Sequence, residues 1–275
     1  MIFKDKTVII TGGSEGVGAA TARLFAAAGA HLLLVARTKK TLEALAEELR
    51  DETRVEIFAM DVRDQDGCAN LFKKAEFEYG RVDILINNAG YHARGPVVSV
   101  KPDDLAAMID VNLRAPILLT RLALPYLKDS GGAIINVGSL AGRAPIPGSA
   151  VYAASKAGLR SFTYAIADEL ADSGIKFAVV SPGPVDTGFI MADIDEVSDL
   201  TFSQPLSTAE EVAQTVLDLC GNSLREQSMP PSSGFLTTLM YLMPWLGKRV
   251  RPMLERKGAR VKRELKQRKA GGGES

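Results

Sequence analysis

Short apolar runs alternate with amphipathic stretches through the first two thirds of the chain. The runs predict strands at residues 7–10, 31–35, 55–60, 84–86, 133–137 and 176–180. The stretches between them predict helices near residues 19–28, 40–50, 65–79, 102–129 and 151–171. Strands and helices that alternate at this spacing form right-handed βαβ units. The alternation therefore predicts an α/β fold, with one doubly wound parallel sheet covered by helices on both faces.

Composition excludes several classes of protein. The chain has 275 residues with 33 Lys plus Arg and 33 Asp plus Glu, so a formal net charge of zero gives no reason to expect nucleic-acid binding. Two cysteines, Cys68 and Cys220, fit a reducing cytoplasmic setting without a disulfide framework. The two histidines, His31 and His92, form no pair with a cysteine at metal-ligand spacing, so we expect no metal and interpret both as structural or solvated. The charged N-terminus is unlike a signal peptide.

A glycine-rich turn, TGGSEGVG at residues 11–18, follows the first predicted strand and opens the first predicted helix. Glycine lets the backbone approach a pyrophosphate closely, and the helix N-terminus presents unpaired N–H groups with partial positive charge. An ordinary strand-to-helix turn is the alternative, but the place of this turn in an alternating chain favours a Rossmann-type nucleotide site. The residues assigned to that site are Gly12, Ser14, Glu15, Gly16, Val17 and Gly18.

The residue that ends the second predicted strand indicates which nucleotide binds. An acidic residue there binds a ribose 2′-hydroxyl, whereas an arginine accommodates a 2′-phosphate. The chain has Arg37 at this place, and its first acidic residue, Glu43, lies a turn into the next helix. A guanidinium can bind a phosphate through two hydrogen bonds, with Ser14 or Lys39 assisting. The pattern predicts NADP(H).

Tyr152 and Lys156 lie four residues apart at the start of a predicted helix, so their side chains point the same way. An ammonium near a phenol lowers the phenol pKa from about 10 and makes it a usable proton donor or acceptor. Ser139 follows the fifth predicted strand, at the carboxyl edge of the sheet where sites form in this architecture. We expect these three side chains to meet there.

With these motifs in place, the chain resembles the compact branch of the short-chain dehydrogenase/reductase superfamily over residues 4–220. The resemblance rests on TGGSEGVG, Asp61-Val62, NNAG at 87–90, Asn112, Ser139, Tyr152 with Lys156, and PGPVDT at 182–187. It implies an NADPH-dependent carbonyl reductase, or the reverse alcohol dehydrogenase. An idle NADP(H)-binding protein is disfavoured because the catalytic set is complete, and an epimerase or dehydratase because its glycine spacing and chain length differ.

The resemblance also implies the role of each motif residue. Tyr152 would donate a proton to the carbonyl oxygen, Ser139 would orient that oxygen, and Lys156 would hold the nicotinamide ribose. Asn112 would anchor a water that links Lys156 to solvent. Further cofactor contacts would come from Asp61 and Val62 at the adenine, from Asn88, Ala89 and Gly90 at the ribose, and from Pro182, Gly183, Val185 and Thr187 at the nicotinamide.

The last third of the chain bears on the substrate. Residues 186–206 predict a loop with short helical turns, a helix follows at 208–219, and residues 221–234 predict a polar loop. Apolar residues of the 186–206 loop, which we call the substrate loop, are suited to a hydrophobic ketone. A weaker resemblance to 3-ketodihydrosphingosine reductases, based on TGGSEGVG, LLLVAR and the tail, points to a lipid-like one. Steroid, retinoid and small xenobiotic ketones stay open.

We divide the chain into a catalytic domain, 1–233, an extension, 234–269, and a disordered tail, 270–275. The extension is apolar over 234–247, with 14 residues too short to span a bilayer, and then basic, with eleven basic and two acidic residues over 248–269. Two interpretations stay open. The extension is a lid over the substrate, or it contacts a membrane surface peripherally through Leu236, Leu239, Met243, Trp245 and Leu246.

We also expect a homodimer or homotetramer, because closed symmetric assemblies dominate among soluble oligomers. In the superfamily that the chain resembles, the helices near 102–129 and 151–171 pack across a two-fold axis. Apolar residues on those helices, such as Leu118, Leu122, Phe162 and Ile166, suit such a face, although they can equally pack on the sheet.

Overall fold

One parallel sheet organises the chain in the computed structural model, which describes residues 3–127 and 131–271. Within those residues seven strands pair in the order β3-β2-β1-β4-β5-β6-β7. Their bounds are β1 Thr7–Thr11, β2 His31–Ala36, β3 Val55–Ala59, β4 Ile84–Asn87, β5 Ala133–Val137, β6 Lys176–Pro182 and β7 Glu226–Met229. The order reverses between β1 and β4, and ligands of open parallel sheets bind at such a switch point.

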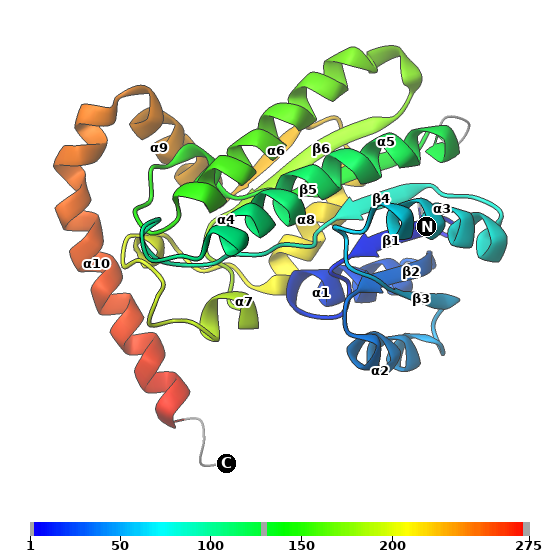
Figure 1. Ribbon diagram of the computed structural model, residues 1–275, viewed down its shortest axis with the longest axis horizontal. Coiled ribbons are helices and arrows are strands. Elements are labelled where there is room, and N and C mark those ends of the chain that lie inside the picture. Colours follow the sequence, from blue (N-terminus) through cyan, green and yellow to red (C-terminus); the bar gives the residue numbers. More distant parts are fainter. Residues whose placement is uncertain (1–2, 128–130, 272–275) are drawn as a thin grey trace.

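Helices cover both faces of this sheet (Figure 1). One face carries α1 Gly16–Ala27, α2 Lys39–Leu49 and α8 Ala209–Gly221. The other carries α3 Gln65–Tyr79, α5 Ala115–Leu127 and α6 Ala150–Glu169, with α4 Pro102–Ile109 preceding α5. Successive strand residues point to opposite faces, so Ile9 belongs to one core and its neighbours Val8 and Ile10 to the other. The predicted α/β fold is confirmed, and its six predicted strands agree with β1–β6 to within two residues.

The predicted polar loop at 221–234 is wrong in part. Glu226–Met229 forms β7, which pairs with β6, and α9 Pro231–Leu242 begins directly afterwards. The sequence of β7, EQSM, shows neither alternation nor β-branched residues. Its strand conformation comes instead from backbone pairing with β6 and from the bonds of one buried carboxylate, described below.

The predicted long helix at 102–129 is interrupted in its middle. A π-helical turn, Asp110–Arg114, joins α4 to α5, and the predicted end at 128–129 lies outside the described residues. Such a turn inserts one extra residue per turn and is frequent at functional sites. The turn contains Asn112, which is completely buried.

The extension consists of α9 and the long α10, Pro244–Gly271. Figure 1 shows α10, in orange and red, passing along the side of the molecule where α7, Gly188–Met191, lies. Of the predicted tail, residues 270–271 end α10 and residues 272–275 lie outside the described residues. Across residues 3–127 and 131–271, none of the helices has the length and apolar character that crossing a bilayer requires.

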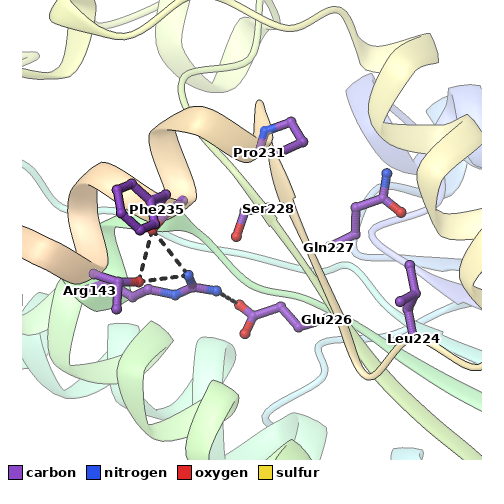
Figure 2. A pocket seen from close by; sticks show the side chains of 9 residues that line it. Arg143, Leu224, Glu226, Gln227, Ser228, Pro231 and Phe235 are labelled. Atoms are coloured by element: carbon purple, nitrogen blue, oxygen red, sulfur yellow. Dashed lines mark hydrogen bonds and ion pairs between the residues drawn. The ribbon is translucent and has the colours of Figure 1, made fainter.

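A buried ion pair holds α9 against the core. Arg143, four residues after Ser139, pairs with Glu226 of β7 and donates to Thr238 of α9 at 3.2 Å, as Figure 2 shows in part. Glu226 also accepts hydrogen bonds from Arg160, Tyr164 and Ser181. Burial raises the pKa of the Glu226 carboxyl, but these hydrogen bonds outweigh burial and hold it below its usual value. One carboxylate thereby joins β7, α6 and, through Arg143, α9.

The second part of the extension, α10, packs on the substrate loop. As predicted, this loop contains short helical turns, α7 and the 3₁₀ turn Thr201–Ser203. Apolar residues of α10, Val261 and Leu265, pack on the loop's buried cluster. Lys262 donates to the Val197 carbonyl oxygen at 2.7 Å, and Lys266 pairs with Asp195. Part of the basic charge of α10 therefore forms ion pairs with acidic residues of the substrate loop.

We predict that Gly258→Ala detaches α10 from the substrate loop. A Cβ at this position would lie 1.7 Å from the backbone oxygen of Asp199, so helix and loop have to separate. We expect a loss of about 1–3 kcal/mol in the free energy of unfolding and faster tryptic cleavage within α10. Gly247→Ala on the same helix is the matched control, because its nearest neighbour atom lies 3.6 Å away. Equal stability of the two variants would contradict the close packing at Gly258.

Candidate active site

A cavity of about 810 Å³ opens at the carboxyl ends of β1, β4, β5 and β6. Nearly all the predicted cofactor and catalytic residues line it, namely Gly12, Ser14, Glu15, Gly16, Val17, Arg37, Asp61, Val62, Asn88, Ala89, Gly90, Ser139, Tyr152, Lys156, Pro182, Gly183, Val185 and Thr187. The two exceptions are Gly18 and Asn112, which are buried and are not among the residues that line the cavity. Among the described residues, no three His, Cys, Asp or Glu side chains gather as a metal site.

The glycine turn leaves the N-terminus of α1 open to the cavity. The first turn of α1 contains no acidic residue, and no side chain caps its N–H groups. Gly18 packs so closely on the turn that a Cβ there would lie 2.0 Å from the Gly12 carbonyl oxygen. Uncapped N–H groups at a helix N-terminus that follows a tightly packed glycine turn are suited to bind the pyrophosphate of a dinucleotide.

Asn88 fastens the glycine turn to the end of β4. Its side-chain amide donates to the carbonyl oxygens of Thr11 and Gly12, both at 3.0 Å. The Thr11 hydroxyl in turn accepts from the backbone N–H groups of Asn88 and Ala89. The Asn88 side chain is therefore occupied in holding the two loops together, and the backbone of residues 88–90 forms the cavity wall.

Both charged residues that the sequence assigned to the adenosine half of a nucleotide, Arg37 and Asp61, line the cavity. Arg37 is exposed, and its charge adds to the effect of Arg63, whose hydrogen bonds hold the pKa of Asp61 below its usual value. Lys39, proposed as a helper, is not among the residues that line the cavity and pairs with Glu43 at 3.4 Å.

Tyr152, Ser139 and Lys156 meet in the cavity as predicted. The Tyr152 hydroxyl is hydrogen-bonded to Ser139. The Lys156 ammonium lies 5.8 Å from the centre of the Tyr152 ring and donates to the Val137 carbonyl oxygen at 2.8 Å. Burial lowers the pKa of Lys156 to about 8.

The expected lowering of the Tyr152 pKa does not occur in this structure. Burial raises the pKa of Tyr152, and the hydrogen bond with Ser139 and the charge of Arg94 offset that rise only in part. The Lys156 ammonium makes its hydrogen bond to the Val137 carbonyl oxygen. Desolvation of the phenolate is therefore the dominant effect here.

Asn112 lies in the π-helical turn, and both the oxygen and the nitrogen of its side-chain amide are hydrogen-bonded. Its carbonyl oxygen accepts from the Tyr91 N–H at 2.8 Å, and its amide donates to the Tyr91 carbonyl oxygen and to Ser155. The structure thus gives this side chain a second task besides the one implied by the resemblance. It fixes the backbone that follows the NNAG segment.

That backbone carries two residues to which the sequence assigned no role in the site. The His92 ring stacks on the Tyr152 ring with 4.1 Å between centroids and 11° between planes. The Arg94 guanidinium lies 5.5 Å from the centre of the Phe189 ring in the substrate loop. The sequence could have indicated a role for His92 and Arg94, because both follow the NNAG segment directly and this segment was assigned to the site.

Apolar side chains complete the outer wall of the cavity. The substrate loop contributes Phe189, Ile190, Val197 and Leu200, and the extension contributes Met240 of α9 and Leu254 of α10. Segments far apart in the sequence therefore enclose the space next to Tyr152.

Comparisons with known proteins agree with this geometry. The family model of short chain dehydrogenases matches residues 6–197. Sulfoacetaldehyde reductase 2 of Chromohalobacter salexigens is 38% identical over 76% of this chain and 86% of its own length. The 3-oxoacyl-[acyl-carrier-protein] reductase of Thermotoga maritima is 35% identical over 81% of this chain and 93% of its own length.

Solved structures are similar as well. A short chain dehydrogenase from Burkholderia cenocepacia in complex with NADP has a TM-score of 0.77 and 30% identity, covering 84% of this chain and 98% of that one. An alcohol dehydrogenase from Thermococcus sibiricus complexed with 5-hydroxy-NADP has a TM-score of 0.73 and 27% identity, covering 81% and 95%.

We predict that Lys156→Met changes how stability depends on pH. The folded protein holds the pKa of Lys156 at about 8, below the unfolded value near 10.4, so the unfolded state binds more protons between these values. Wild-type stability should therefore gain up to about 3 kcal/mol as pH rises from about 8 to about 10.4, and the variant should lack this gain. Urea unfolding of both proteins at about pH 7 and about pH 10 measures it. Parallel pH curves would show that Lys156 is not desolvated.

Proposed function

The chain belongs to the short-chain dehydrogenase family and is an oxidoreductase, and we propose that it transfers a hydride between NADP(H) and a ketone or secondary alcohol with a hydrophobic body. The observation that carries this proposal is the meeting of Tyr152, Ser139 and Lys156 in the same cavity as the open N-terminus of α1. One end of the cavity fits a pyrophosphate and the other holds a hydrogen-bonded phenol.

In reduction, the nicotinamide of the bound cofactor supplies the hydride. The Tyr152 hydroxyl gives its proton to the carbonyl oxygen, and the Ser139 hydroxyl donates a hydrogen bond that orients this oxygen. Lys156, mostly protonated at neutral pH because its pKa is about 8, would hold the ribose hydroxyls of the cofactor and stabilise the phenolate that Tyr152 becomes. Burial raises the pKa of Tyr152 in this structure, and a Lys156 ammonium held closer to the phenol would lower it.

NADPH is the proposed cofactor. Arg37 is exposed at the adenosine end of the cavity, where a 2′-phosphate would meet its guanidinium, and Ser14 lies on the same wall. The two solved structures named above are complexes with NADP or a derivative of it, which supports the same choice.

The substrate is proposed to be hydrophobic, and a lipid-like ketone is the favoured form. The apolar residues of the substrate loop and the extension that line the cavity support this choice. Met240 and Leu254 in particular support the interpretation of the extension as a lid. The two relatives named above differ in substrate, sulfoacetaldehyde for one and a 3-oxoacyl group for the other, and both substrates have a reducible carbonyl.

The outer side of the extension supports a peripheral membrane contact in addition. Large apolar side chains are exposed around the junction of α9 and α10, close in sequence to the exposed charges of Lys248 and Arg249; they are Phe235, Tyr241, Leu242 and Trp245. Of the five residues named from the sequence, only Trp245 is exposed, whereas Leu236, Leu239, Met243 and Leu246 are half-buried. Apolar side chains beside basic ones suit an anionic lipid surface.

Assembly as a homodimer or homotetramer stays a prediction. The four residues proposed for the contact, Leu118, Leu122, Phe162 and Ile166, are half-buried in the single chain.

Tyr152→Phe tests the proposed chemistry. It retains the ring and deletes the proton donor, so turnover of a ketone panel should fall about 10²–10⁴-fold while NADPH binding stays nearly intact. Loss of NADPH absorbance measures turnover, and NADPH fluorescence measures binding. Tyr241→Phe, at an exposed tyrosine, is the control. Turnover within a few-fold of wild type would exclude Tyr152 as the proton donor.

Arg37→Asp tests the cofactor. Wild type should prefer NADPH to NADH by about 1.5–3 kcal/mol, the size of a charge-assisted hydrogen bond, and the variant should reverse the order. Lys39→Ala is the control, because Lys39 lies outside the cavity lining and pairs with Glu43. Equal binding of NADPH and NADH by the wild type would contradict the assignment.

Replacing Leu242 and Trp245 together by serine tests the membrane contact. Wild type should bind phosphatidylserine-containing vesicles at low salt and release them at high salt, because each basic residue near such a surface contributes about 1 kcal/mol that salt screens. The double variant should lose binding, whereas the control Phe77→Ser, at an exposed residue of α3, should keep it. Sedimentation with vesicles measures both. Absence of wild-type binding at low salt would leave the lid interpretation alone.

A further inference from the structure

Two buried nitrogen donors beside Tyr152 have no acceptor. They are Nε2 of His92 and Nε of Arg94, and neither has a hydrogen-bond partner among the described residues. Both residues line the cavity that Tyr152 and Ser139 also line. Native proteins pair nearly all their buried donors, so an unpaired one calls for an explanation.

Arg94 determines which nitrogen of His92 carries the proton. A guanidinium can only donate hydrogen bonds, and Arg94 Nη1 lies 2.6 Å from His92 Nδ1. Nδ1 must therefore accept, which places the proton on Nε2 and makes Nε2 a donor. Burial, the charge of Arg94 and that of Lys156 together lower the pKa of His92 to about 3, so the ring is neutral at physiological pH.

The rest of the Arg94 guanidinium is held in place. Its Nη2 donates to the backbone oxygen of Phe189, and its face lies over the Phe189 ring. Burial lowers the pKa of Arg94, and the negative charges of Asp193 and Glu196 in the substrate loop partly offset this effect. Among the described residues, neither carboxylate is hydrogen-bonded to Arg94. The pair therefore presents a positive charge and two fixed N–H donors, and both donors call for an acceptor.

We propose that His92 and Arg94 form a subsite for an oxyanion group of the substrate, a carboxylate or sulfonate bonded close to the carbonyl carbon. This proposal rests on the proposed function. The oxyanion would be the polar end of a substrate whose hydrophobic part contacts the apolar lining of the cavity. An anionic oxygen can accept from either unpaired nitrogen and is attracted by the Arg94 charge, whereas a hydrocarbon or an ammonium group can do neither. The parallel stacking of His92 on Tyr152 puts the subsite directly beside the proton donor.

Asn112 positions this subsite from behind. Its side chain holds both backbone groups of Tyr91, the residue before His92. Asn112 therefore acts on substrate binding through the loop, because its own side chain is not among those that line the cavity.

Matched substrates test the proposal. We expect wild type to reduce 2-oxo or 3-oxo acids about 10- to 100-fold more efficiently, in kcat/KM, than their methyl esters, the range set by one or two charge-assisted hydrogen bonds. Arg94→Leu should abolish this acid-to-ester ratio, and Arg94→Lys should restore part of it. His92→Phe, which keeps the stacking and removes the donor, should lower the ratio less. Arg121→Leu, at an exposed arginine of α5, should keep the wild-type ratio.

A binding measurement separates this proposal from the proposed function. Propionate and methanesulfonate, which cannot be reduced, should bind the wild-type NADPH complex and quench its fluorescence, and Arg94→Leu should weaken that binding about tenfold or more. If no carbonyl compound is reduced yet these anions bind through Arg94, the subsite stands and the proposed function fails. If ketones are reduced but acid and ester are used alike, or the anions bind wild type and Arg94→Leu equally, the subsite is wrong.

Discussion

The close contact between the start of α1 and the glycine turn fixes the geometry on which the site depends. Gly18 can touch the Gly12 carbonyl only because it has no Cβ, and Asn88 then ties the same turn to the end of β4. The open N-terminus of α1 is thereby set at the switch point between β1 and β4. Tyr152 and Ser139 reach the same edge from α6 and the end of β5. A side chain at residue 18 would push the helix away from both.

Charged groups taken out of water meet two different environments in this protein. Lys156 is desolvated in the cavity, and Arg94 is half-buried next to it with its charge unmatched by a hydrogen-bonded carboxylate among the described residues. Glu226, by contrast, is satisfied by four partners and serves as a structural joint. Hydrogen bonds from other residues therefore offset the cost of desolvating Glu226. In the cavity, a bound ligand has to offset the corresponding cost for Lys156 and Arg94.

Local motifs could be predicted from the sequence, and pairings across long distances could not. The strands, the glycine turn and the Tyr152–Lys156 spacing are local sequence features, so the fold and the placement of Tyr152 and Lys156 in one cavity were predictable. Arg94 meets Phe189 across 95 residues, and no local pattern reports such a contact. The short β7 has no strand pattern either, because its conformation depends on pairing with β6 and on the partners of Glu226.

Tertiary contacts also explain part of the basic charge that is concentrated near the end of the chain. Taken alone, a basic stretch at residues 248–269 suggests a partner outside the chain, yet Lys262 and Lys266 bind the substrate loop at Val197 and Asp195. That loop carries Phe189 at the cavity wall, and Phe189 in turn receives Arg94. A continuous series of contacts therefore runs from α10 through the loop to the subsite beside Tyr152. The position of α10 and the shape of the substrate site must then depend on one another, because the loop is bonded to α10 on one side and to Arg94 on the other.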